Sequence, residues 1–296
     1  MHTSHTLVLA LSLVLVASGF AEAQKVGPSH CFQVASSIDA RLASFAGDGA
    51  IPADPGAAAI KDRSPRHCYF KTLELFGAVQ SLRKSKGAPA LDLPPVPSEE
   101  LTPAHVHELA QATLLALDSL QYAFRGAKPP PLIPFVEGKK PSDVYAMLAR
   151  CELRLAKLGT TFGPSDCYRE AGLLERELEV LSAARQVKVT APPATGLAGK
   201  KPADCYAAAH ELFAALAPLS KDIPIQAPAA RTGELKPAHV LDLLSQALAD
   251  IHALRIAAGR KDSLRLPELV AGKAPGDVLG RIERAQVLVK GLAAAR

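Results

Sequence analysis

The chain has no tryptophan and only 5 tyrosines among its 296 residues, and aromatic residues make up 5% of it. So few rings argue against a protein that stacks nucleic-acid bases and, more weakly, against a sugar-binding platform. The net charge of +5 is small for this length, and no long run of Lys or Arg occurs. We therefore expect no binding to nucleic acid.

The signatures of common enzymes are missing as well. The chain has no Gly-x-Ser-x-Gly elbow, no Gly-x-x-x-x-Gly-Lys phosphate loop, no His-Glu-x-x-His motif and no Cys-x-x-Cys-His haem attachment site. We predict a protein that is not an enzyme and that carries no cofactor. Hydrophobic residues nevertheless make up 48% of the chain, which is enough for a folded core.

The N-terminus has the anatomy of a secretory signal peptide. An apolar stretch at 7–20, too short to span a bilayer comfortably, precedes a small-residue cleavage site at 21–23. Cleavage before Gln24 would remove residues 1–23 and export the remainder to the periplasm or the cell exterior. No later segment is apolar over the roughly 18 residues that a membrane helix needs, so we predict no transmembrane segment after cleavage.

An internal repeat dominates the rest of the chain. Its pattern is proline, any residue, His or Asp, then Cys or Val, and eight copies start 37, 38, 38, 23, 38, 35 and 38 residues apart. The short step separates two groups of four, and in both groups the fourth residue runs Cys, Cys, Val, Val. We predict two tandem modules, at 24–160 and 161–296. The repeats begin at Pro28, Pro65, Pro103, Pro141, Pro164, Pro202, Pro237 and Pro275.

Each repeat is predicted to open a helix. Proline suits the first helical position, and the His or Asp after it lies near the unpaired N–H groups of the first turn. Apolar or small residues then recur three or four positions apart, as at Cys205, Ala209, Leu212 and Leu216. This stripe is typical of helix bundles, so we predict an all-α fold of two four-helix modules.

The connectors within a module are long and often rich in proline, as at 87–101 and 127–140. About 17 residues of polyproline-like chain reach roughly 50 Å, whereas a helix of about 18 residues is only about 27 Å long. Each connector can therefore run back along the bundle and start the next helix at the same end. We predict that neighbouring helices within a module are largely parallel.

Four of the five cysteines hold equivalent positions, Cys31 and Cys68 in the first module and Cys167 and Cys205 in the second. Exported proteins favour disulfides. Equivalent residues on adjacent parallel helices can also approach within the roughly 4.4–6.8 Å Cα separation that a disulfide requires. We predict the pairs Cys31–Cys68 and Cys167–Cys205. Cys151 lies on the apolar stripe and is predicted to be a buried free thiol.

Metal binding is an alternative for the helix starts, because histidine and cysteine are good ligands for zinc or copper. Adjacent residues on a helix, however, point about 100° apart, and the second module has Asp where the first has most of its histidines. We assign no metal ligands and predict that these residues cap their helices. The candidate ring is His30, His67, His105 and Asp143 in the first module, and Asp166, Asp204, His239 and Asp277 in the second.

Two further sets of side chains recur near the helix starts. Aromatic residues at the fifth position are predicted to wedge between helices or against the connectors. The basic pairs Lys139-Lys140 and Lys200-Lys201, just before two of the helices, are predicted to be solvated loop ends. The aromatic residues are Phe32, Tyr69, Tyr145, Tyr168 and Tyr206.

These patterns favour a non-enzymatic, exported helical-repeat protein that acts as a binding, scaffolding or structural component of the periplasm or cell exterior. Its expected partner is another protein or a cell-envelope component, and the repeat also allows a homo-oligomer. One alternative is a metal-handling or redox accessory protein that uses Cys and His at the helix starts. Another is an enzyme with a cleft between the modules, built on the repeat-breaking residues Cys151, His210 and His252.

Overall fold

The computed structural model describes residues 25–47, 51, 60–193 and 197–295, and the predicted signal peptide lies outside them. Within these ranges the protein is all-α, and each of the eight α-helices begins at a proline of the repeat. None of the described helices is long and apolar enough to cross a membrane. The helices are α1 (Pro28–Ala46), α2 (Pro65–Ser85), α3 (Pro103–Asp118), α4 (Pro141–Lys157), α5 (Pro164–Ala184), α6 (Pro202–Leu216), α7 (Pro237–Ala257) and α8 (Pro275–Ala294), with single 3-10 turns η2 (Gln121–Ala123) and η3 (Ala217–Leu219).

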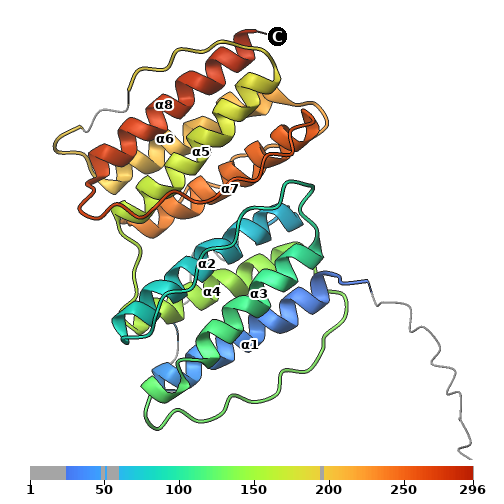
Figure 1. Ribbon diagram of the computed structural model, residues 1–296, viewed down its shortest axis with the longest axis vertical. Coiled ribbons are helices and arrows are strands. Elements are labelled where there is room, and N and C mark those ends of the chain that lie inside the picture. The colour runs from blue at the N-terminus through green and yellow to red at the C-terminus, as the bar shows by residue number, and fades with distance from the viewer. Residues whose placement is uncertain (1–24, 48–50, 52–59, 194–196, 296) are drawn as a thin grey trace, which may run out of the picture.

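The helices form two sets, α1–α4 and α5–α8 (Figure 1). In the first set, α1 and α2 each pack against both α3 and α4; in the second, α5 and α6 each pack against both α7 and α8. Helices that are consecutive in the chain, such as α1 and α2, therefore stand diagonally across their set. The four starting prolines of each set surround one small cavity. All four helices of a set thus start at the same end and run parallel, as the long connectors predict.

The repeated His or Asp caps its own helix. In all eight α-helices its side chain accepts a hydrogen bond, 2.8–3.2 Å long, from the backbone N–H of the residue before the proline. Histidine accepts through Nδ1, so in this role the ring is neutral and carries its proton on Nε2. A carboxylate and a neutral imidazole can therefore perform the same task, which explains why Asp and His exchange at this position.

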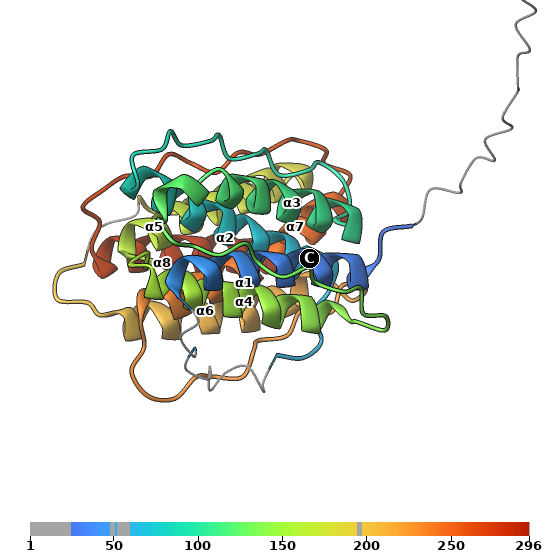
Figure 2. The same cartoon turned by 90° about the horizontal axis from the view of Figure 1, so that it is seen from below.

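The connectors that the structure describes in full run along the outside of the helices (Figure 2); they are 86–102, 119–140, 217–236 and 258–274. The connector between α2 and α3 meets the one between α7 and α8, where Val96 N donates to Leu264 O at 2.9 Å. Another connector crosses the start of α8 so closely that a Cβ atom on Gly276 would lie 1.7 Å from Leu197 O. Glycine therefore stands at a position where the other repeats have Ser, Arg or Ala.

The two sets meet through α2 and α7, which face each other in the middle of the molecule (Figure 1). Each of these helices also packs inside its own set, so both are buried on nearly every side. Their shared face is not simply apolar, because it contains the buried side chains of Lys71 and Glu74 on α2 and of Asp250 on α7. At the start of α2, Arg66 Nε donates to Asp250 Oδ1 at 2.9 Å.

The close crossing at Gly276 predicts a stability effect. Replacing Gly276 by Ala should lower the free energy of unfolding by about 1–3 kcal/mol, because backbone atoms of Leu197 would have to move. Urea denaturation of the purified protein measures this loss. Gly27→Ala is the matched control, since a Cβ atom there would meet nothing within 4 Å. Equal stability of the two variants would show that the connector does not cross α8 in this way.

Candidate functional site

The helix starts do not form the predicted disulfides. All five cysteines are buried free thiols. The predicted pairs, Cys31–Cys68 and Cys167–Cys205, are wrong because consecutive helices are diagonal rather than adjacent. Neighbouring helix axes lie roughly 8–10 Å apart, so diagonal axes lie at roughly 13 Å. Even Cα atoms that face each other, each about 2.3 Å from its axis, would then be about 8 Å apart, beyond the roughly 7 Å limit for a disulfide.

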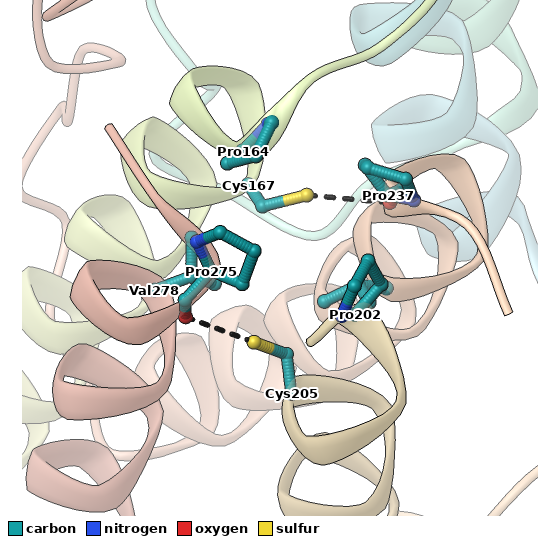
Figure 3. A pocket seen from close by; sticks show the side chains of 8 residues that line it. Pro164, Cys167, Pro202, Cys205, Pro237, Pro275 and Val278 are labelled. Carbon is teal, nitrogen blue, oxygen red and sulfur yellow. Dashed lines mark hydrogen bonds between the residues drawn. The ribbon is translucent and has the colours of Figure 1, made fainter. Parts of the chain in front are cut away.

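Each of these four thiols instead donates to a carbonyl at the start of a neighbouring helix. Figure 3 shows Cys167 Sγ pointing to Pro237 O, at 3.3 Å, and Cys205 Sγ pointing to Pro275 O, at 3.0 Å. In both sets, the first two helices supply the thiol and the last two supply the carbonyl, which explains the order Cys, Cys, Val, Val. The equivalent bonds of the first set are Cys31 Sγ to Pro103 O, 3.1 Å, and Cys68 Sγ to Pro141 O, 3.2 Å.

The cavity among these residues is too small for a ligand. Its volume in the second set is about 10 Å³, on the order of a single water molecule. Proline, cysteine and valine line it, and the cavity of the first set has the same composition and size. The helix starts are therefore a packed joint between parallel helices rather than a binding pocket.

Basic residues before the helices stack on aromatic rings. Lys139 Nζ lies 4.3 Å from the ring centre of Phe32, and Lys273 Nζ lies 4.5 Å from that of Tyr168. These equivalent pairs join the start of α4 to α1 and the start of α8 to α5. The interpretation of Lys139 as a solvated loop end is thus wrong, because its ammonium packs against an aromatic ring of another repeat.

The candidate metal ligands do not converge on a common point. The Nδ1 atom of each helix-start histidine binds the backbone of its own helix start. Within the described ranges, no group of three or more His, Cys, Asp or Glu side chains could hold a metal ion. Burial also raises the pKa of Cys31 and Cys205 to about 11, which keeps these thiols protonated and poor as ligands.

The repeat-breaking residues lie in three separate places. Cys151 is buried in α4, and its Sγ lies 3.5 Å from a carbonyl oxygen of α1. His210 Nε2 lies 2.9 Å from Pro228 O of the connector that follows α6. His252 is buried between the two sets, with Nδ1 3.2 Å from Glu177 Oε1. They do not form one candidate active site.

The chemical groups that the structure does bring together lie between α2, α4, α5 and α7. The centre of this group is the Lys71 ammonium, which is only 2% exposed. Its Nζ lies 2.6 Å from Glu152 Oε2, 3.0 Å from Asp242 Oδ1 and 3.2 Å from Glu74 Oε2. We call the group the interface cluster; its members are Lys71, Glu74, Tyr145, Glu152, Glu170, Asp242 and Ser245.

Hydroxyl groups complete the interface cluster. Tyr145 OH donates to Asp242 Oδ1 at 2.6 Å, across the boundary between the two sets. Ser245 Oγ lies 3.2 Å from Glu170 Oε1 and 3.3 Å from Glu74 Oε2, so it can donate to either carboxyl group. Side chains of both sets therefore share one continuous hydrogen-bonded network.

The interface cluster has more carboxyl groups than cations. Burial raises the pKa of Glu152 and Glu170 to about 7 and that of Glu74 well above its usual range. Burial also opposes ionisation of Asp242, but the Lys71 charge and the hydrogen bonds from Tyr145 and Lys71 together outweigh it and lower the pKa of that carboxyl. The same carboxylates hold the pKa of Lys71 well above its ordinary value. Burial therefore favours the protonated form of Glu74, whereas Lys71 and Asp242 favour the charged form of each other.

This arrangement can hold protons, and its centre is more deeply buried than its edge, where the side chains of Glu152 and Asp242 are 12% and 17% exposed. Lys71 and Glu74 are buried, and no member of the cluster lines either helix-start cavity. A perturbed pKa is as compatible with a structural network as with catalysis. Sequence reasoning missed the cluster because charges at these positions look like a solvated face. The sequence of α7 could have indicated it, because apolar residues on every side of a helix are typical of a helix that is buried all round.

The thiol geometry predicts low reactivity. The native protein should react with no thiol reagent at pH 8 within minutes, because a pKa of about 11 leaves about a thousandth of Cys31 or Cys205 as thiolate. In denaturant, all five thiols should react. Intact mass without reductant is the second measurement. A mass lower by four hydrogens, with peptides 31–68 and 167–205 linked, would restore the disulfides and contradict this packing.

The carboxyl groups of the interface cluster predict that stability falls as pH rises. A carboxyl whose folded pKa is raised stabilises fully below its unfolded pKa, near 4.5, and loses this contribution as pH rises to about 7. For Glu170 the change amounts to about 3 kcal/mol. We expect Glu170→Gln to match the parent at pH 5 and to be more stable at pH 7.5, by urea denaturation.

The control for this experiment is Glu283→Gln, which replaces an exposed carboxyl and should change stability little at either pH. His67 contributes in the opposite direction. Burial lowers its pKa, so its contribution is lost as pH falls below about 6.5. Equal pH dependence of the parent and the Glu170→Gln variant would show that this carboxyl is ionised in the folded protein.

Comparison of the chain with known proteins gives no relative from which a function could be transferred. No protein-family model matches it. No curated protein and no solved structure matches it either.

Proposed function

We propose that the protein is a non-enzymatic, exported binding and scaffolding protein, in which the two helix sets form a frame and the connectors carry the partner surface. The observation that carries this proposal is where large apolar side chains are exposed. Within the described ranges there are nine, and six lie on connectors rather than on helices. These six are Leu91, Leu132, Phe135, Val136, Leu269 and Val270.

Two of the exposed pairs occupy equivalent positions. Phe135-Val136 precedes α4 by the same number of residues as Leu269-Val270 precedes α8. All four side chains are between 42% and 49% exposed. Isolated exposed apolar residues need no explanation, but the same pair presented by both sets supports a surface that contacts a partner.

The interface cluster supports the frame. Removing one member of a buried, hydrogen-bonded ion network leaves an uncompensated charge, which commonly costs about 3–5 kcal/mol. Separation of the two sets would expose the Lys71 contacts with Asp242 and the Tyr145 contact with the same carboxylate. The two sets should therefore behave as one body that holds its connectors at constant separations.

Site-directed photocrosslinking tests the proposal. A photoreactive residue at Phe135 or at Leu269, in cells that export the protein, should give one recurring adduct of defined mass. The same residue at Lys290, on the exposed side of α8, should give none. Adducts at neither connector would contradict a partner surface there. Stoichiometric zinc or copper in the purified protein would favour the metal-handling alternative instead.

A further inference from the structure

One connector carries the large apolar side chain that is most exposed among the described residues. We call residues 127–136, which lead from the end of α3 towards α4, the strap. It runs along the outer edge of the first helix set, α1–α4, beside α1 (Figure 1). Leu132 is 99% exposed, and the prolines on either side of it, Pro131 and Pro134, are exposed as well.

Exposure along the strap repeats every three residues. Ala127, Pro130 and Ile133 are half-buried, and the residues between them, 128–129 and 131–132, are exposed. A period of three is that of a polyproline II helix, which has three residues per turn and no internal hydrogen bonds. One ridge of the strap therefore faces the bundle, and the other two face solvent.

The outward ridges carry a specific order of side chains. Lys128, Pro131 and Pro134 follow one another at intervals of three, so they lie on one ridge. Pro129, Leu132 and Phe135 lie on the next. The segment 119–136 contains no acidic residue, and its charged residues, Arg125 and Lys128, are both basic and exposed.

From this geometry we infer that Lys128–Pro134 is a preformed recognition strand for a partner domain with an aromatic-lined groove and an acidic rim. Grooves of this kind bind polyproline II segments through successive prolines and read orientation from a flanking basic residue. The inference rests on the proposed function, because it names the surface and the class of partner.

Other modes of peptide recognition do not fit the strap. Addition to a sheet edge needs backbone N–H donors, and Pro129, Pro130, Pro131 and Pro134 have none. Helix-in-groove binding needs a segment that can become helical, which four prolines prevent. The basic ridge selects an acidic partner surface by charge complementarity.

A second copy of this chain is a poor partner for the strap. The chain has no tryptophan. Three of its tyrosine rings, Tyr69, Tyr145 and Tyr206, are buried, and Tyr168 is covered by Lys273 and Arg281. The fifth, Tyr122, is 94% exposed, but it lies in the 3-10 turn η2, on the same α3–α4 connection as the strap. One exposed tyrosine does not form an aromatic-lined groove, so we place the aromatic groove on a different protein.

The strap is held in place by contacts that leave Lys128, Pro131 and Pro134 exposed. Gln33 Nε2 of α1 donates to Ile133 O at 2.9 Å, on the ridge that faces the bundle. At the far end, the Phe135 ring lies 4.9 Å from the His30 ring, centre to centre. A partner would thus meet a strand that is already extended, and little conformational entropy would be lost on binding.

The test uses the whole exported chain and a purified SH3-type domain that recognises basic-x-x-Pro-x-x-Pro peptides. Titration of the isotope-labelled chain should shift amide signals of Lys128, Leu132 and Ile133, with a dissociation constant on the order of 10–100 µM. Pro131→Ala and Pro134→Ala should each weaken binding about tenfold. Lys128→Glu should weaken it too and reduce its salt dependence.

Pro129→Ala is the matched control, because it removes a proline of the same strap from the other ridge and should change affinity less than about twofold. No shift with the domain at about 1 mM would overturn the inference. So would binding that survives both proline substitutions, or self-association that Pro134→Ala abolishes, which would assign the strap to a second copy. Crosslinks at Leu269 would persist in all these cases, so failure here is distinguishable from failure of the proposed function.

Discussion

The constraint on which the rest of the structure depends is that the four helices of a set all start at one end. Parallel helices bring four positive dipole ends together, which is unfavourable unless the N-termini are capped and charge is balanced. Proline at the first helical position and a capping His or Asp two residues later meet the first need in every helix. An aspartate at this position also supplies negative charge that balances the dipoles, and the helix set α5–α8 has three such aspartates. The thiol-to-carbonyl bonds then tie neighbouring starts to one another.

The same constraint accounts for the connectors. Each must return along the full length of a helix, so it lies on the outside of its set and cannot contribute a compact turn (Figure 2). Proline lowers the entropy lost when so long a segment is ordered. Where a connector passes close to a helix, the helix has a residue without a side chain, as at Gly276. Where it passes at the rim, as in the strap, it leaves apolar and basic side chains such as Leu132 and Lys128 in solvent.

The contact between the two sets depends on buried charged groups rather than on helix capping. Buried ion networks are rarely the most stable way to fill an interface, but they tolerate few alternative pairings. Lys71 can approach Glu152 and Asp242 together only when α2, α4 and α7 hold one arrangement. Specificity of docking, rather than strength, is the property that such a cluster supplies. It also makes the docking sensitive to protons, since several of its carboxyl groups share one cation.

The amino-acid sequence by itself determined the all-α fold, the eight helix starts and their parallel direction, because capping, apolar periodicity and connector reach are local properties of the chain. Only the tertiary structure decided which helices are neighbours. Adjacent and diagonal placements of consecutive helices are both compatible with the connector lengths. In the diagonal placement, Cys31 and Cys68 do not form the predicted disulfide, and each thiol donates to a proline carbonyl instead. The interface cluster was equally hidden, because the sequence shows that Lys71 is charged but not that a second helix set covers it. Burial of a charge depends on what packs against it, and that partner lies more than a hundred residues away along the chain, at Asp242.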